Sequence, residues 1–282
     1  GGYGGLAGVG CAAAAGGSEP ALVVLSHTPP GAARTWALVG KGIVYDTGGL
    51  SIKAGASMCK MKSDMGGAAG LLGAFKAAVE LGAGDNLHLV LCVAENSVGP
   101  ASFRNDDILR LRSGKTVEVN NTDAEGRLVL GDGVAHAADV LAPDVVLDMA
   151  TLTGAQMVAT GKQFAAVVSD SAELETAVVA AGRASGDLAF PLLWAPEFHA
   201  KEFESAVADM KNSVKDRSNA QSSCAASFVR AHLDGPRVRD GEGFGGTWAH
   251  VDMAGPSLAG ERGTGYGVAL VLELLGLGSS RA

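Results

Sequence analysis

Short apolar runs alternate along this chain with longer segments in which apolar residues recur at helical spacing. Runs rich in Val, Leu and Ile predict strands over residues 21–27, 35–46, 86–96, 144–154 and 246–255. Helical spacing predicts helices over residues 65–82, 126–142, 172–183, 222–232 and 265–278. This order is typical of an α/β fold in three layers, with a largely parallel central sheet and helices on both faces. Without an internal repeat or an obvious linker, residues 1–282 are expected to form a single domain.

Composition narrows the class of protein. The 282 residues are 47% hydrophobic, which is enough to bury a substantial core. A net charge of -8 without a basic stripe argues against a nucleic-acid surface. No run reaches the roughly 20 apolar residues that a membrane span needs. The Gly- and Ala-rich start resembles the interior of a longer protein, so we expect an upstream domain to be missing. Four scattered cysteines predict reduced thiols in the core of a cytoplasmic protein: Cys11, Cys59, Cys92 and Cys224.

The segment NNTDAEGRLVL, residues 120–130, places charges just before a predicted helix. Thr122 and Glu125 have the spacing of a capping box, and acidic groups are favoured at a helix start. Capping does not explain Arg127, whose charge is unfavourable there, or the clustering of Asp123 and Glu125 around it. Capping and a functional site therefore both remain open from this segment alone.

A second group of charges follows the strand predicted over residues 35–46. Lys41 lies within the apolar strand, Asp46 lies at its exit, and Lys53 follows a Gly-Gly turn. Asp64 stands at the opening of the next helix. Each has an ordinary alternative, namely a turn, a snorkelling lysine, a buried ion pair or a helix cap. Because sites in such sheets gather beyond the carboxyl ends of the strands, their coincidence at one edge favours a site.

The two groups together supply carboxylates with no histidine or cysteine nearby, namely Asp46, Asp64, Asp123 and Glu125. Oxygen ligands of this kind suit Mn, Mg or carboxylate-ligated Zn, and four carboxylates are enough to bridge two ions. Two such ions polarise a reacting group and supply hydroxide near neutral pH. A lysine could join them as a ligand only if it were neutral.

These residues, in this order, resemble the catalytic domain of the leucyl aminopeptidase family, most closely its branch of probable aminopeptidase-like proteins. The similarity extends over nearly the whole chain, through VGKGIVYDTGG, SDMGGAA, DMATLTGA and WAHVDMAG, and NTDAEGR is the family's signature. The resemblance implies two metal ions, usually Zn or Mn. It implies that Asp46 and Glu125 contact both ions, that Asp123 completes one, and that Lys41 with Asp64 completes the other.

The resemblance also implies a reaction. Lys53 would donate to the carbonyl oxygen and the tetrahedral intermediate, and Arg127 would hold a bicarbonate that acts as general base. A free α-amine would bind one ion and the scissile carbonyl the other, so only peptides with an unblocked N-terminus would react. Met61, Thr151 and Gly154 would line the first side-chain pocket, and Leu152 would orient the substrate backbone. For these four residues, ordinary core packing is an equal alternative.

Some features depart from the family pattern. Ser257 stands where members often carry Met at the pocket floor, which puts a preference for leucine in doubt. We expect the family's N-terminal domain to lie outside this chain. Members usually assemble as homohexamers, so the resemblance implies a homohexamer here too. The candidate site residues are also compatible with two rival functions, a two-metal phosphoesterase and a catalytically weak or inactive metal-binding scaffold. A scaffold, however, would have no need of Lys53 and Arg127.

Overall fold

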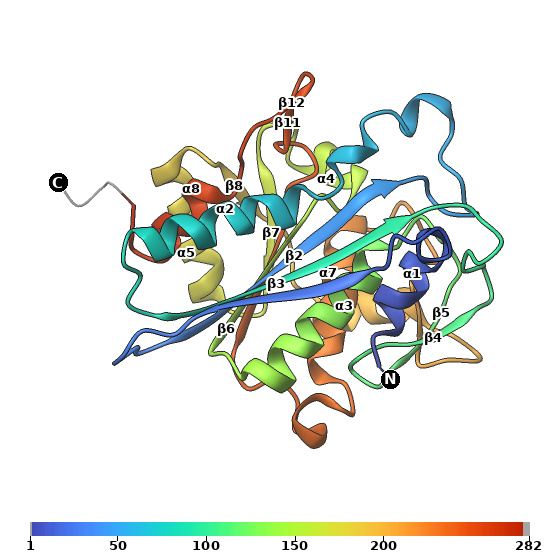
Figure 1. The fold of residues 1–282 in the computed structure, drawn as a ribbon, viewed down its shortest axis with the longest axis horizontal. Coiled ribbons are helices and arrows are strands. Elements are labelled where there is room, and N and C mark those ends of the chain that lie inside the picture. The colour runs from blue at the N-terminus through green and yellow to red at the C-terminus, as the bar shows by residue number, and fades with distance from the viewer. Residues whose placement is uncertain (1, 279–282) are drawn as a thin grey trace.

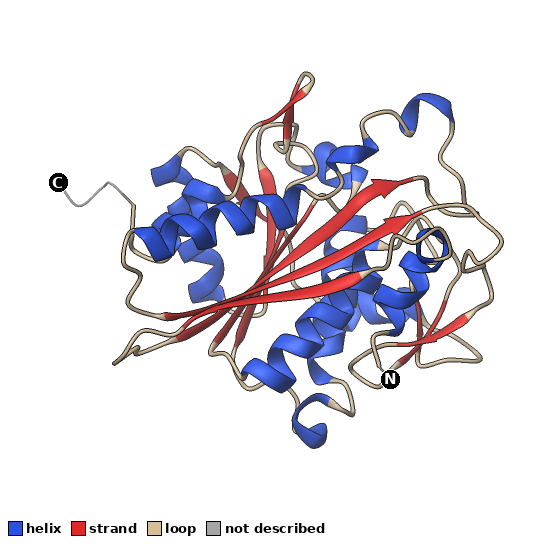
Figure 2. Ribbon diagram, viewed as in Figure 1, coloured by secondary structure: helices blue, strands red, loops and turns tan. Residues whose placement is uncertain are grey.

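A seven-stranded mixed sheet runs through the middle of the computed structural model, which describes residues 2–278 (Figures 1 and 2). The strand order is β1-β3-β2-β6-β10-β7-β8. The four central strands β3, β2, β6 and β10 are parallel to their neighbours within this group. Strand β1 is antiparallel to β3, β7 is antiparallel to β10, and β8 is parallel to β7. The largely parallel sheet predicted from the sequence is confirmed.

The strands of this sheet are β1 Ala21–His27, β2 Thr35–Asp46, β3 Asn86–Asn96, β6 Val145–Ala150, β7 Ala165–Ser169, β8 Ala189–Pro191 and β10 Thr247–Asp252. Two small sheets contain β4 Ile108–Arg110, β5 Thr116–Glu118 and β9 Met210–Lys211, and β11 Leu258–Ala259 with β12 Arg262–Gly263. The α-helices are α1 Gly4–Ala14, α2 Gly66–Glu80, α3 Gly126–His136, α4 Gly154–Ala159, α5 Ala172–Ser185, α6 Pro196–His199, α7 Gln221–Ala231 and α8 Val268–Leu274. Single turns of 3-10 or π-helix are η1 Gly55–Ser57, η2 Met61–Ser63, η3 Ala137–Leu141, η4 Ala200–Phe203, η5 His232–Asp234 and η6 Val238–Gly241.

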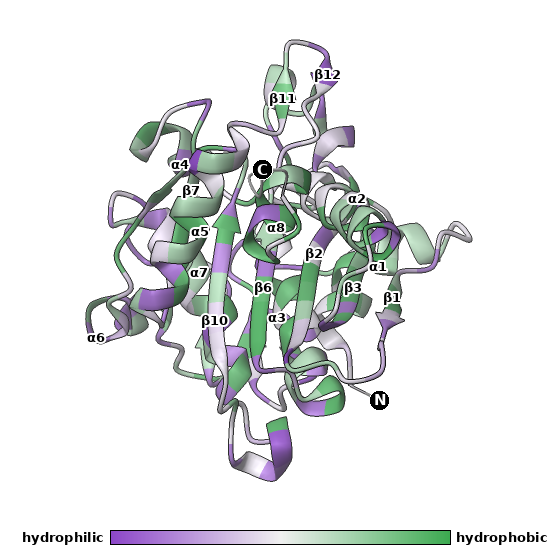
Figure 3. Ribbon diagram, turned by 90° about the vertical axis from the view of Figure 1, so that its left-hand side faces the viewer, coloured by the Kyte–Doolittle hydropathy of each residue, from purple (hydrophilic) through white to green (hydrophobic). Residues whose placement is uncertain are grey.

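Two hydrophobic cores lie on opposite faces of the sheet, because successive side chains of a strand point to opposite faces. In β2, Trp36 and Leu38 belong to one core and Ala37 and Val39 to the other. Helices α2, α5 and α8 cover the first core, and α1, α3 and α7 cover the second. Strand β6, which contributes residues to both cores, is coloured mainly as hydrophobic in Figure 3. The three-layer arrangement is therefore confirmed.

The structure adds elements to those predicted. The bounds of β1, β2 and β3 match the predicted strands, whereas α1 and β7 were not predicted. Helix α3 ends at His136 and continues as the π-helical turn Ala137–Leu141. The single domain over residues 1–282 stays a prediction. Residues 1 and 279–282 lie outside the described residues. No helix among residues 2–278 is long and apolar enough to cross a bilayer.

Gly67 sets how closely α2 packs on the sheet. A Cβ at this position would lie 2.0 Å from the carbonyl oxygen of Met149 and 2.9 Å from Cα of Ala150, both in β6. We expect Gly67→Ala to lower the free energy of unfolding by about 2–4 kcal/mol, because the backbone of a central strand would have to move. Urea denaturation measures this. Gly84→Ala is the control, since a Cβ there meets open space, and an equal loss in both variants would contradict the close-packing argument.

Candidate metal centre

The candidate residues meet at the carboxyl ends of the central strands, as the sequence predicted. Asp46 is the last residue of β2, and Thr151 follows the last residue of β6. A cavity of about 580 Å³ opens there. All candidates except Arg127 line it, namely Lys41, Asp46, Lys53, Met61, Asp64, Asp123, Glu125, Thr151, Leu152 and Gly154.

Three carboxylates converge in this cavity from two distant segments of the chain. Asp46, Asp123 and Glu125 each offer an oxygen, and these oxygens lie within 4.8 Å of one another. Asp46 and Glu125 are buried, and Asp123 is half-buried. Oxygen atoms at this separation form a donor set that can hold a hard divalent cation.

Lys41 joins this group to the fourth carboxylate. Its Nζ lies 2.9 Å from Oε1 of Glu125 and 2.9 Å from Oδ1 of Asp64, and it also donates to the carbonyl oxygen of Thr151 at 3.0 Å. Asp64 accepts a hydrogen bond from Oγ1 of Thr151 at 2.8 Å, but its Oδ2 is buried without a partner among the described residues. Gly126 permits this approach, because a Cβ there would lie 2.5 Å from Cε of Lys41.

Lys53 occupies the other side of the cluster. Its Nζ lies 2.8 Å from Oδ2 of Asp46 and 2.6 Å from Oδ1 of Asp123, with its side chain 15% exposed. Burial lowers the pKa of Lys53, but Asp46 and Asp123 outweigh burial and leave that pKa raised. Lys53 therefore stays a cation that faces the cavity.

The cluster holds more negative than positive groups. Burial raises the pKa of Glu125 to about 8, and Asp46 and Asp64 add to the rise while Lys41 opposes it. Burial also raises the pKa of Asp64 to about 6, with a further contribution from Asp46. Burial lowers the pKa of Lys41, but the surrounding carboxylates outweigh it and leave that pKa raised. This excess of negative charge favours the binding of cations. The Oδ2 atom of Asp64, which has no partner among the described residues, supports the same conclusion.

Arg127 is buried and does not line the cavity. It is the second residue of α3, and its guanidinium carbon lies 5.9 Å from the centre of the Phe203 ring. Its Nε and Nη1 are buried without a partner among the described residues. Burial lowers the pKa of Arg127 to about 10, while Glu125 opposes the shift, so the group is charged at neutral pH. A buried guanidinium with free donors fits a small planar anion.

The capping interpretation of these segments is wrong. Helix α3 begins with Glu125 as its N-cap and has no side-chain cap. Thr122 instead donates from Oγ1 to the carbonyl oxygen of Gly48 at 2.6 Å and accepts from the amide of Ser51 at 2.7 Å. Helix α2 also begins without a side-chain cap, so Asp64 has no capping role.

Sequence reasoning missed residues that orient the cluster. Asn96, which is fully buried at the end of β3, donates from Nδ2 to Oδ1 of Asp46 at 2.9 Å and to the carbonyl oxygen of Thr122 at 3.0 Å. Its place at the end of a predicted central strand could have identified it. Asp252 at the end of β10 was missed too, although it bonds to the loop after β6 and not to the cluster. The prediction that all cysteines are core residues is right for Cys92 and Cys224 only, since Cys59 is exposed.

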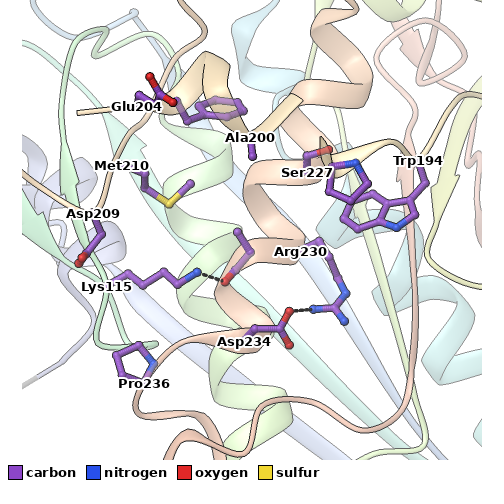
Figure 4. A pocket seen from close by; sticks show the side chains of 13 residues that line it. Lys115, Trp194, Ala200, Glu204, Asp209, Met210, Ser227, Arg230, Asp234 and Pro236 are labelled. Carbon is purple, nitrogen blue, oxygen red and sulfur yellow. Dashed lines mark hydrogen bonds and ion pairs between the residues drawn. The ribbon is translucent and has the colours of Figure 1, made fainter. Parts of the chain in front are cut away.

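A second cavity, of about 650 Å³, lies away from the acid cluster (Figure 4). Residues of β9, η4 and α7 line it together with connecting segments, and the lining includes Lys115, Trp194, Met210 and Arg230. Three of the charged side chains drawn there are already engaged, since Lys115 donates to the carbonyl oxygen of Ala231 and Arg230 pairs with Asp234. None of the clustered carboxylates lines this cavity, so size alone does not identify the site.

The fold and the site define a class of protein. The chain belongs to the cytosol aminopeptidase family, whose catalytic-domain model matches residues 1–272. The chain is 60% identical over 278 residues to the human protein named probable aminopeptidase NPEPL1, covering 99% of this chain and 51% of that protein. It is 49% identical over 276 residues to leucine aminopeptidase 1 of Caenorhabditis elegans, covering 98% of this chain and 54% of that protein.

Solved structures agree with this membership. The leucyl aminopeptidase of Trypanosoma brucei in complex with bestatin superposes with a TM-score of 0.91 at 50% identity, covering 97% of this chain and 51% of that one. The chain thus spans about half the length of the relatives that it matches.

Proposed function

We propose that this chain is a two-metal aminopeptidase domain that releases the N-terminal residue from peptides with a free α-amine. One observation carries the proposal, the convergence of carboxylate oxygens of Asp46, Asp123 and Glu125 within 4.8 Å of one another. Lys41 and Asp64 extend this set on one side. Membership of the cytosol aminopeptidase family supports the reaction class.

Five residues would hold the two ions, namely Lys41, Asp46, Asp64, Asp123 and Glu125. The ions would be Zn or Mn, with Mg possible, because the donors are mainly oxygen atoms. When bound, two such ions polarise the scissile carbonyl and supply hydroxide near neutral pH. Lys41 must lose its proton to serve as a ligand, so loading is expected to release protons.

Lys53 and Arg127 would carry out the remaining steps. The Lys53 ammonium faces the cavity and would donate to the carbonyl oxygen as negative charge develops there. Arg127 would hold bicarbonate through the donors that have no partner among the described residues, and bicarbonate held there would supply a general base.

Four cavity residues would bind the substrate, namely Met61, Thr151, Leu152 and Gly154. Ser257 lines the same cavity, and its Oγ donates to the carbonyl oxygen of Ala254 at 3.1 Å. A small side chain at this place supports a first pocket that is not shaped for leucine alone. We further propose a cytoplasmic location, in line with the family's name, and a homohexamer as the assembly.

Metal removal tests this proposal. Purified protein is expected to contain close to two divalent ions per chain and to hydrolyse leucine amide. Chelation should abolish hydrolysis, and Zn or Mn should restore it. Leucine amide with a blocked amine is the control and should not react, because it lacks the free α-amine.

Other outcomes would refute the proposal. Full activity without metal would remove the two-metal mechanism. Turnover of p-nitrophenyl phosphate instead of the amide would identify a phosphoesterase, and two bound ions without either activity would identify a scaffold.

A further inference from the structure

Two loops that line the site cavity leave neighbouring strands. The first, residues 151–154, follows β6 and ends on the first residue of α4, and the second, residues 253–257, follows β10. Strands β6 and β10 are paired in parallel with Asp252 opposite Ala150. Both loops thus begin at the same level of the sheet, and their relative position determines the shape of the cavity between them.

Asp252 is hydrogen-bonded to both loops. Its side chain is fully buried at the last position of β10. In the first loop its carboxylate accepts from the amides of Leu152 and Thr153, each at 3.1 Å, and from Oγ1 of Thr153 at 2.6 Å. In the second loop it accepts from the amide of Ala254 at 3.2 Å. One carboxylate therefore satisfies four donors, which is a strong arrangement for a buried acceptor.

Further hydrogen bonds connect the two loops through Thr153, which is bonded to Asp252. Thr153 is the N-cap of α4 and accepts from the amide of Gln156 at 3.2 Å. Gln156, also fully buried, accepts from the amide of Gly255 in the second loop at 2.6 Å. A closed set of hydrogen bonds thus joins the two loops at two places, and Asp252 is the one member that bonds to both loops at the strand ends.

Another buried aspartate provides a comparison within the same sheet. Asp148 in β6 is also fully buried, and it accepts from Nε1 of Trp248 at 2.7 Å and interacts with Nδ1 of His250 at 2.5 Å. These partners are core residues of β10, and neither they nor Asp148 line the site cavity. Asp148 therefore resembles Asp252 in burial and charge, but it bonds to side chains of β10 and not to the two loops.

We propose that Asp252 is a positioning residue that sets the shape of the substrate cavity by holding the loops 151–154 and 253–257 together. This inference rests on the proposed aminopeptidase function. Asp252 is fully buried and makes no hydrogen bond or ion pair to the candidate metal ligands among the described residues, although its charge also acts on Arg127. Its effect should therefore appear in how substrate binds, with the metal content and the chemical step retained.

Asp252→Asn tests this role, because the variant keeps the shape but replaces one acceptor oxygen by an NH₂ group that faces amide donors. We expect KM for leucine amide to rise about tenfold or more while kcat changes by less than about threefold. Metal content should stay as in the unsubstituted protein. Asp148→Asn is the matched control, and its KM should stay within about twofold even though it removes a buried charge from the same sheet.

A second pair of variants keeps the test decisive if Asp252→Asn does not fold. Thr153→Val removes the hydroxyl donor and should raise KM, whereas Thr153→Ser, which retains the hydroxyl, should raise it less. Equal KM values for Asp252→Asn and Asp148→Asn, or for Thr153→Val and Thr153→Ser, would overturn the proposal.

The test also separates this inference from the proposed function. Calorimetric binding of L-leucine to the metal-loaded protein should weaken about tenfold in Asp252→Asn but not in Asp148→Asn. If the unsubstituted protein bound L-leucine with this pattern but did not hydrolyse the amide, the proposed function would fail and the positioning role would stand. If hydrolysis were normal and binding equal in both variants, only the positioning role would fail.

Discussion

Glu125→Gln is expected to prevent tight binding of divalent ions and to lower kcat/KM for leucine amide by at least about a thousandfold. Glu125 is 2% exposed, and its oxygen lies among those of Asp46 and Asp123. An amide of the same shape carries no charge and is a weaker ligand for a hard cation. Metal analysis after dialysis and steady-state kinetics with leucine amide measure both effects.

The same substitution should stabilise the metal-free protein above pH 8. Burial and the neighbouring acids raise the folded-state pKa of Glu125 to about 8 from a normal 4.5, so the folded state binds the proton more tightly than the unfolded state. The free energy of unfolding therefore falls as pH rises from about 4.5 through about 8. Glu125→Gln lacks this titration, so above pH 8 the chelated variant should unfold at a higher urea concentration than the chelated unsubstituted protein.

This reversal makes loss of activity in Glu125→Gln distinguishable from loss of fold. Glu118→Gln is the control, because Glu118 pairs with Lys211 at 3.7 Å in a small sheet outside the site. That variant should retain metal and activity. A Glu125→Gln protein that still held two ions and hydrolysed the amide at the normal rate would remove Glu125 from the proposed ligands.

The sheet was predictable because its central strands are buried on both faces. Strand β2, Thr35–Asp46, could be predicted from its sequence because an apolar run of this length fits few other structures. Helix α1 was not predictable in this way. Its segment is rich in glycine, which has low helix propensity, and the helix forms because Leu6 and Val9 are buried in the core that α3 also covers. Such tertiary packing is not visible in a local pattern.

The acid cluster was predictable in part for a similar reason. Asp46 stands at the end of a central strand, and Asp123 and Glu125 stand beside an arginine that capping does not explain, so local sequence marked each position. The hydrogen bonds that hold these residues connect positions far apart in the chain. The ends of predicted central strands could have marked Asn96 and Asp252 as candidates, but their bonding partners follow only from the alignment of β3 beside β2 and of β10 beside β6.

Lys53→Ala should separate the binding of metal from the chemical step. We expect kcat to fall about 100- to 1000-fold, equivalent to about 2.7–4 kcal/mol, because a preorganised cation would be lost from beside the developing oxyanion. Metal content should stay unchanged. Lys53 lies 2.8 Å from Oδ2 of Asp46 and 2.6 Å from Oδ1 of Asp123, so its ammonium competes with cations for both carboxylates. Removing it should therefore leave metal affinity equal or higher.

Two further variants make the role of Lys53 specific. Lys53→Met keeps the length of the side chain without its charge and should lose as much kcat as Lys53→Ala, since charge and not packing is the cause. Lys76→Ala also removes one positive charge, but Lys76 is exposed on α2 and pairs with Glu80 at 3.5 Å, so its kinetics should be normal. Normal kcat in both Lys53 variants would show that this lysine only neutralises the carboxylates of the metal-free protein. Loss of metal together with activity would instead place Lys53 among the residues that build the metal site.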